Sequence, residues 1–447
     1  PPPAAYSPGP PQSYPHYGAG YQPSVPGYYP GPYPPWAPPR PKRNTYQLVI
    51  SIIAFICACL ISLAGIITGL ILLLISVVST DRLGPQQLFG GQVLFVVFTI
   101  AGLVGGGFSL YHSGRALFFR KASAPFKLPW FWIFFILYLA VLIMAAALRG
   151  NGLALANVPG TIFLISLAGI LPALTFLALG ARRLRSPRKD DWPTTWRRFT
   201  LSLVCGTTLS IALALILEAL LSLVVVGLNA LNLNDPNMPI PRDAQGIITV
   251  LIVVSVVAPL VEEAVKPLGV VALIGRVRGA AEAFLLGMAG GIGFDLIETS
   301  GYISQGYKDW LDVAIQRSTA GLLHGLGAAM VALGIYYLTH RDSVNRRVLI
   351  GIGCILYAIL QHAIWNGSFL LQLLPGPLGS YLANGTVTLG PVSFQAFMLV
   401  YLFESLLMLI FFIFVTGKLR GKSSEPSLQQ PVPQMAMQAQ RPAEARL

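Results

Sequence analysis

The stretch Pro259-Leu-Val-Glu262-Glu263-Ala-Val-Lys266-Pro267 is the one around which this chain is organised. It lies inside an apolar run from about residue 247 to 274, and roughly 20 apolar residues suffice to cross a bilayer as a helix. A charge near the middle of such a helix costs about 2.5–3.5 kcal/mol, so intramembrane ionisable residues indicate a functional site by default. Glu262 and Lys266 are four apart and can pair on one face. Glu263 points about 100° away, so that single pair does not account for both carboxylates.

The composition of the chain is that of a polytopic membrane protein. Hydrophobic residues make up 54% and charged residues 11%, with a mean hydropathy of +0.67, whereas a soluble domain carries about 25% charged residues. The net charge of +13 is not the footprint of a nucleic-acid-binding protein, because the basic residues lie in short loops between apolar runs. The sequence therefore predicts an all-α polytopic membrane protein that contacts the lipid bilayer and binds no nucleic acid.

About ten apolar runs predict ten transmembrane helices. They cover roughly residues 47–78, 92–111, 127–148, 160–180, 199–227, 247–274, 281–303, 318–339, 348–371 and 394–417. The first run is overlong and contains Gly65 and Gly69, so a tilted helix and a tight hairpin both remain open. Outside these runs, residues 1–45 are rich in Pro, Tyr and Gly and residues 421–447 in Gln and Pro, which predicts disordered tails at both ends.

The loops between the runs predict the orientation of the chain. Lys and Arg collect on the cytoplasmic side of membrane proteins. With ten spans and a cytoplasmic N-terminus, the basic clusters, including the dense loop at residues 182–198, all fall on that side. A hairpin in the first span would invert everything after it and break this alternation. We therefore expect a multi-pass integral membrane protein with both termini in the cytoplasm.

Ionisable side chains are unevenly distributed among the predicted spans. Spans one to four carry almost none, whereas spans six to nine carry nearly all of them. This asymmetry predicts a transmembrane scaffold at residues 46–230, a functional core at residues 245–372 and a last helix at residues 393–418.

Four polar clusters fall in four consecutive spans of that core. Apart from the adjacent Glu262 and Glu263, residues in one cluster lie three, four or seven positions apart and so can share a helix face. The clusters are Glu262, Glu263 and Lys266; Asp295, Glu298 and Tyr302; Arg317 and His324; and His362 and Asn366. The expected depths of the clusters overlap, so we expect the carboxylates and the two imidazoles to converge around one point.

Two histidines with two or three carboxylates are consistent with two kinds of hydrolytic site. Neutral imidazole and carboxylate can bind a zinc-like ion with one position left for water. Alternatively, a desolvated Glu can itself act as general base on water, with His and Asn stabilising the oxyanion. Either route hydrolyses an amide.

The ordered motifs resemble the PrsW family of intramembrane proteases. The matching residues are Glu262-Glu263-Ala-Val-Lys266, Gly293-Phe-Asp-Leu-Ile-Glu298-Thr-Ser-Gly-Tyr302, Arg317 to His324, and His362-Ala-Ile-Trp-Asn366. The resemblance covers about residues 247–372 and extends more broadly to CAAX prenyl proteases and bacteriocin-immunity proteins. Asp295 departs from the pattern, and its added negative charge beside Glu298 could favour a cation.

The resemblance implies an intramembrane endopeptidase of a bacterial cell membrane. Its substrate would be a membrane-embedded or membrane-anchored protein, such as an anti-sigma factor. By position, Glu262 and Glu263 would activate water, with His362 and Asn366 completing the catalytic set. Glu298, His324 and His362 would hold a divalent metal such as zinc, or act as acid and base.

Two other classes of function compete with a protease. An ion- or proton-coupled transporter also uses buried Glu, Lys and His, but transporters usually carry internal repeats, and no repeat of fixed period is visible in the chain. A non-catalytic membrane adaptor, in which a former site survives as a folding element, is the second competitor.

Overall fold

The computed structural model describes residues 45–78, 84–119, 121–151, 158–185, 192–226, 243–339, 344–389 and 392–420. Contacts divide the chain into Pro1–Thr45 and Tyr46–Leu447, and the helical fold belongs to the second unit. The two tails predicted to be disordered lie outside the described residues, except for Thr45, with which α1 begins. The expected division of the membrane region into scaffold, core and last helix stays a prediction.

Helices account for nearly all of the described residues. The α-helices are α1 (Thr45–Val78), α2 (Pro85–Ile100), α3 (Gly106–Phe118), α4 (Phe131–Gly150), α5 (Val158–Leu184), α6 (Trp196–Cys205), α7 (Ile211–Val226), α8 (Ala244–Leu251), α9 (Ala258–Val265), α10 (Leu268–Val271), α11 (Ala280–Gln305), α12 (Trp310–Gln316), α13 (Ala320–Thr339), α14 (Val344–Gly367), α15 (Pro377–Asn384) and α16 (Met398–Leu419). The π-helical segments are η1 (Ala101–Gly105), η2 (Gly206–Ser210) and η3 (Ile252–Val257). The 3₁₀ turns are η4 (Tyr307–Asp309), η5 (Arg317–Thr319) and η6 (Ser368–Leu373).

The prediction of ten membrane-spanning helices is confirmed for the part of the chain that the structure describes. The spans are α1, α2 to α3, α4, α5, α6 to α7, α8 to α10, α11, η4 to α13, α14 to η6, and α16. Of the two possibilities left open for the first span, the single helix holds, because α1 runs from Thr45 to Val78 without a break. The last span begins at Met398 rather than near residue 394, because β2 (Val392–Gln395) pairs with β1 (Thr386–Leu389) in an antiparallel hairpin.

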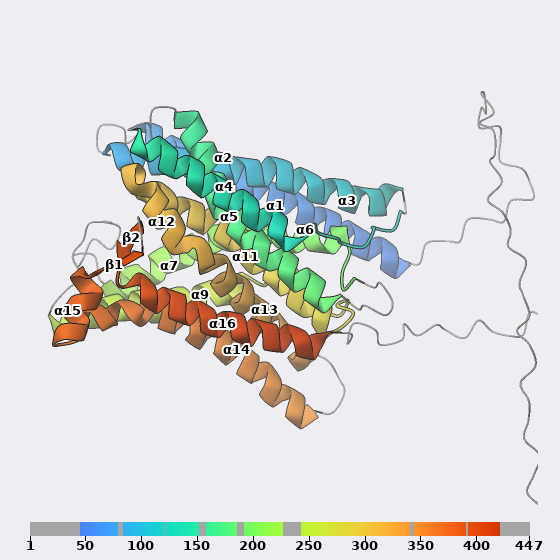
Figure 1. The fold of residues 1–447 in the computed structure, drawn as a ribbon. Helices are drawn as coiled ribbons and strands as arrows, with labels where there is room; N and C mark the ends of the chain where they lie inside the picture. Colours follow the sequence, from blue (N-terminus) through green and yellow to red (C-terminus); the bar gives the residue numbers. More distant parts are fainter. Residues whose placement is uncertain are drawn as a thin grey trace, which may run out of the picture. The chain divides into compact units, whose positions relative to one another are not determined.

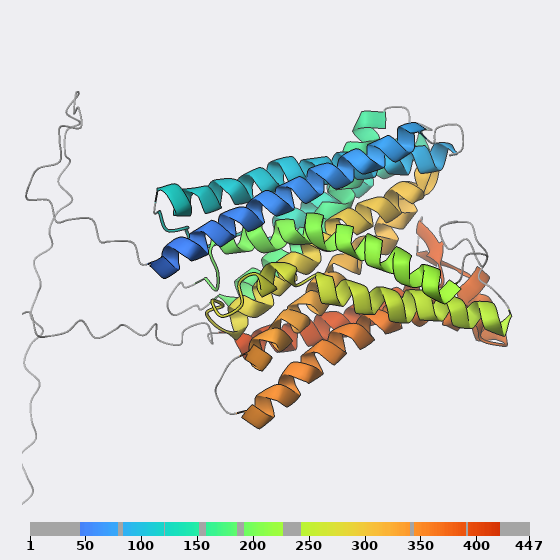
Figure 2. The same ribbon diagram turned by 180° about the vertical axis from the view of Figure 1, so that it is seen from behind.

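Two spans lie at the centre of the unit. Within an 18-residue apolar stretch of each span, 94% of the positions are buried in the α11 span and 83% in the span that contains α13, against 17% in α16. The helices α11 and α13 are therefore inner helices. Figures 1 and 2 show α11 and α13 running side by side, with α2, α5 and α6 packed on α11 and with α14 and α16 packed on α13.

Glycines allow α11 and α13 to pack closely. A Cβ atom at Gly291 would meet the carbonyl oxygen of His324, and one at Gly287 would meet that of Ala328. Small residues at such positions let two membrane helices approach along their backbones. This approach sets the α11 cluster beside His324.

The span that contains Pro259 and Pro267 is broken into short pieces. It runs through α8, the π segment η3, the eight-residue α9 and a turn at Pro267 into α10. Proline has no N–H to donate to the preceding turn of a helix, and π segments interrupt helices frequently at functional sites. Glu262 and Glu263 therefore sit on a short helix with Pro259 in its first turn, and Lys266 follows that helix directly, before Pro267.

Candidate metal centre

Lys266 joins the two adjacent glutamates of α9. Its Nζ atom lies 2.8 Å from Oε2 of Glu262 and 2.7 Å from Oε1 of Glu263, and its side chain is fully buried. The pair between Glu262 and Lys266 is the one expected from the sequence. Glu263 pairs with the same lysine because positions three and four apart both neighbour it on the helix surface. A single cation thus partners both carboxylates, which the expected single pair did not account for.

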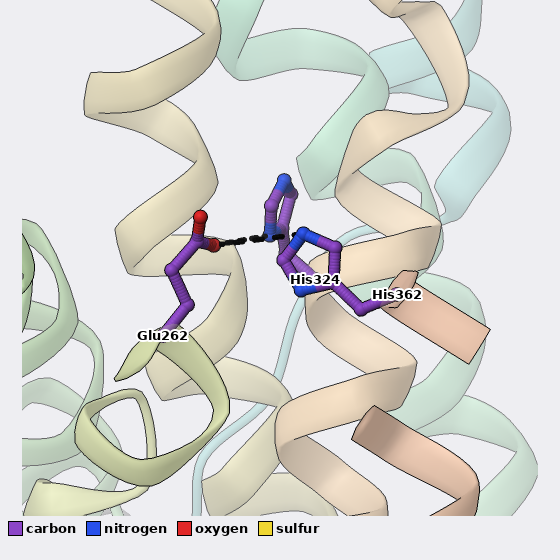
Figure 3. Close-up of side chains that lie close together, drawn as sticks. All are labelled: Glu262, His324 and His362. Carbon is purple, nitrogen blue, oxygen red and sulfur yellow. Dashed lines mark ion pairs between the residues drawn. The ribbon is translucent and has the colours of Figure 1, made fainter. Parts of the chain in front are cut away.

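Glu262 faces two histidines from two other helices. Its Oε2 atom lies 3.7 Å from Nδ1 of His324 on α13 and 3.8 Å from Nε2 of His362 on α14. Figure 3 shows the carboxylate of Glu262 directed towards both imidazoles. The ring planes of the histidines are at 90° with centroids 5.3 Å apart. All three residues are buried, at 5%, 1% and 2% exposure.

The spacing of these three groups fits a divalent metal ion. A tetrahedral zinc ion with bonds of about 2.0–2.2 Å keeps its ligand atoms about 3.3–3.6 Å apart. One ligand atom from each of Glu262, His324 and His362 lies within 4.8 Å of the others. Within the described part of the chain, Nδ1 of His324 has no hydrogen-bond partner, whereas its Nε2 atom lies beside Glu298 and Oε2 of Glu262 lies beside Lys266. Buried polar atoms in native proteins usually have partners, so a metal ion would complete this set.

Each histidine also has a carboxylate next to the ring nitrogen that does not face Glu262. Nδ1 of His362 lies 3.0 Å from Oε1 of Glu263 in a hydrogen bond. Nε2 of His324 lies 2.8 Å from Oε2 of Glu298. In metal sites, a ligating histidine almost always donates its other N–H to such a partner, which sets the tautomer and the ring orientation. This arrangement leaves Nδ1 of His324 and Nε2 of His362 facing Glu262.

Glu298 lies on the far side of His324, together with Asp295 and Arg317. Arg317 places a guanidinium nitrogen 3.2 Å from Glu298 Oε2, and the hydroxyl of Thr299 donates to Asp295 Oδ1 at 2.7 Å. Asp295, Glu298 and His324 form a second group with metal-ligand spacing. The expected ligand set of Glu298, His324 and His362 is thus divided between two groups that share His324.

Asn366 forms a hydrogen bond with the backbone of the span that contains Pro259. Its side-chain amide donates a hydrogen bond of 2.8 Å to the carbonyl oxygen of Val254 in η3. The role expected for Asn366, stabilisation of an oxyanion or orientation of the site, stays a prediction. Sequence reasoning expected Glu262 to converge with both histidines and to activate water, but it did not assign Glu262 as a metal ligand. The only signal that it offered was the clustering of all these residues in successive spans.

A family comparison covers the whole of this site. Residues 194–408 match the model described as PrsW family intramembrane metalloprotease. The match extends the resemblance noted for residues 247–372 on both sides, from α6 to α16. No curated protein and no solved structure matches the chain.

Proposed function

We propose that this chain cleaves a peptide bond of a membrane-embedded or membrane-anchored protein and that Glu262, His324 and His362 form its catalytic centre, in line with the match of residues 194–408 to the PrsW family of intramembrane metalloproteases. The observation that carries this proposal is the spacing of those three groups, with Oε2 of Glu262 at 3.7 and 3.8 Å from the two imidazoles.

Glu262 Oε2, His324 Nδ1 and His362 Nε2 would hold a divalent cation such as zinc. When bound, such an ion makes a water molecule nucleophilic near neutral pH and polarises the scissile carbonyl. Three protein ligands and one open position are typical of catalytic rather than structural zinc sites.

The remaining charged groups orient and neutralise this set. Glu263 holds the ring of His362, and Glu298 holds that of His324. Lys266 offsets the charge of Glu262 and Glu263, and Arg317 offsets that of Glu298. Pairing of this kind is required because an unpaired charge in a membrane interior is costly. Within this arrangement, activation of water by Glu263 and oxyanion stabilisation by Asn366 remain predictions.

The proposal also covers the orientation of the chain, the membrane in which it lies and its substrate class. We place both termini in the cytoplasm, because that orientation puts the basic loops inside. We place the chain in a bacterial plasma membrane and take an anti-sigma-factor-like protein as its substrate class, both on the strength of the family likeness. Fusion of a periplasm-dependent reporter to either end tests the orientation, and activity at either end would contradict it.

Zinc binding is the first test of the site. The full chain, purified in nanodiscs, is expected to hold about one zinc ion, measured by mass spectrometry of metals. His324→Ala and His362→Ala are expected to lose it. His112→Ala is the matched control, because His112 lies on α3, where it stacks on Trp196, and outside residues 194–408. Equal zinc in all four proteins would contradict the proposal.

Cleavage is the second test, and it works even when the substrate has not been identified. New N-termini are mapped in the membrane proteins of host cells that carry wild-type, His362→Ala or His112→Ala protein. Fragments cut inside or beside a membrane span are expected with the wild-type chain and the His112 variant only. A His362→Ala chain that folds, binds its usual partners and leaves the fragment pattern unchanged would identify a non-catalytic adaptor.

A further inference from the structure

Two residues of α14, one helical turn apart, hold the broken span in two different ways. His362 bonds the side chain of Glu263, whereas Asn366 bonds the backbone carbonyl of Val254. The helices are close at this end, since a Cβ atom at Gly367 would lie 3.0 Å from the hydroxyl of Ser255. The contact from Asn366 therefore belongs to a tight interface between α14 and η3.

The carbonyl of Val254 needs a donor from outside its own helix. In η3 the backbone bonds span five residues, and the N–H of Ala258 donates to the carbonyl of Val253. The next donor in that register would be the N–H of residue 259, which is a proline and has none. An unpaired carbonyl inside a membrane protein is destabilising, and the amide of Asn366 supplies the missing hydrogen bond at 2.8 Å.

We infer that Asn366 is a positioning residue of the proposed protease, which replaces the hydrogen bond that Pro259 cannot make and so fixes α9 against α14. This inference rests on the proposed metal site. Val254 lies eight residues before Glu262, so a shift of η3 moves Glu262 and Glu263 together relative to His362. One of the two side-chain N–H groups of Asn366 is thereby used on the backbone.

A double substitution separates positioning from direct catalysis. Asn366→Ala leaves the carbonyl of Val254 unpaired and is expected to weaken zinc affinity about 10–100-fold, the usual effect of losing a supporting group. Pro259→Ala restores a backbone N–H. In the π register of η3, the N–H of residue 259 would then donate to the carbonyl of Val254. The double variant is therefore expected to recover most of the affinity and of the cleavage in the terminus assay.

Zinc affinity is measured by competition with a chelator on the purified full chain in nanodiscs. Asn366→Leu, which keeps the approximate volume without a donor, is the second variant if Asn366→Ala fails to fold, and it too should be rescued by Pro259→Ala. Two results would overturn the inference: no rescue in the double variant, or wild-type zinc affinity with cleavage alone lost. His362→Ala serves as the reference, because unchanged zinc affinity in that variant signals failure of the proposed metal site itself.

Discussion

Nδ1 of His362 lies 3.0 Å from Oε1 of Glu263, across 99 positions of the chain. This hydrogen bond ties α14 to α9, and it directs the other ring nitrogen of His362 towards Glu262. Glu263 is therefore placed to orient His362 as a metal ligand rather than to bind the metal itself. The first prediction concerns this bond.

Glu263→Gln is expected to lower zinc affinity about 10–100-fold without abolishing binding. A glutamine oxygen still accepts the N–H of His362, but the added charge that strengthens the imidazole as a ligand is lost. Chelator competition measures the effect. Glu404→Gln on α16 is the matched control, since it makes the same chemical change in another membrane helix. Equal affinities in the two variants would show that Glu263 does not support His362.

Lys266→Met is expected to destabilise the fold by about 3–5 kcal/mol, because it leaves two buried carboxylates without their cation. Lys266 is fully buried and lies within 2.8 Å of both partners. Thermal unfolding in nanodiscs measures the loss.

Arg149→Met is the contrasting variant for Lys266→Met. Arg149 pairs with Asp309 and Asp312, but its side chain is 42% exposed. Exposed pairs contribute only about 0–1 kcal/mol, so the unfolding temperature should change little. A larger drop in unfolding temperature for Arg149→Met than for Lys266→Met would contradict both expectations.

Gly291→Ala is expected to separate α11 from α13 and to reduce both stability and zinc content. The added Cβ would meet the carbonyl oxygen of His324, which is backbone and cannot move alone. Overpacking of this kind costs about 1–3 kcal/mol. Gly353→Ala on α14 is the control, since a Cβ there has no described neighbour within 4 Å. If both variants behave alike, the close approach at Gly291 is not needed.

The ten spans could be predicted because the signal is local. A bilayer requires about 20 apolar residues in a row, whatever the rest of the chain does. The interruption of the Pro259 span was not predictable in detail. Proline shows that a hydrogen bond is lost, but whether the helix bends, ends or widens into a π segment depends on outside donors such as Asn366.

The composition of the site could also be predicted, but not its internal pairing. Spacing along a helix shows that His362 and Asn366 share a face, and it cannot show which face of another helix meets them. For that reason Glu298 was expected to join both histidines, whereas Glu262 lies between them. Whether Lys266 contacts one carboxylate or two depends on its side-chain rotamer. The spacing in the sequence is compatible with several rotamers.

The two groups that share His324 lead to the last prediction. Saturating zinc is expected to give one ion per chain, because the second group already has its own partners. Arg317 lies 3.2 Å from Glu298, and Thr299 donates to Asp295. Asp295→Asn should therefore leave one ion bound, and Glu298→Gln should weaken binding about 10–100-fold as a supporting group does. Glu262→Gln should lose far more affinity, since it removes a ligand. Two ions per wild-type chain, falling to one in Asp295→Asn, would instead assign Asp295, Glu298 and His324 to a second metal site.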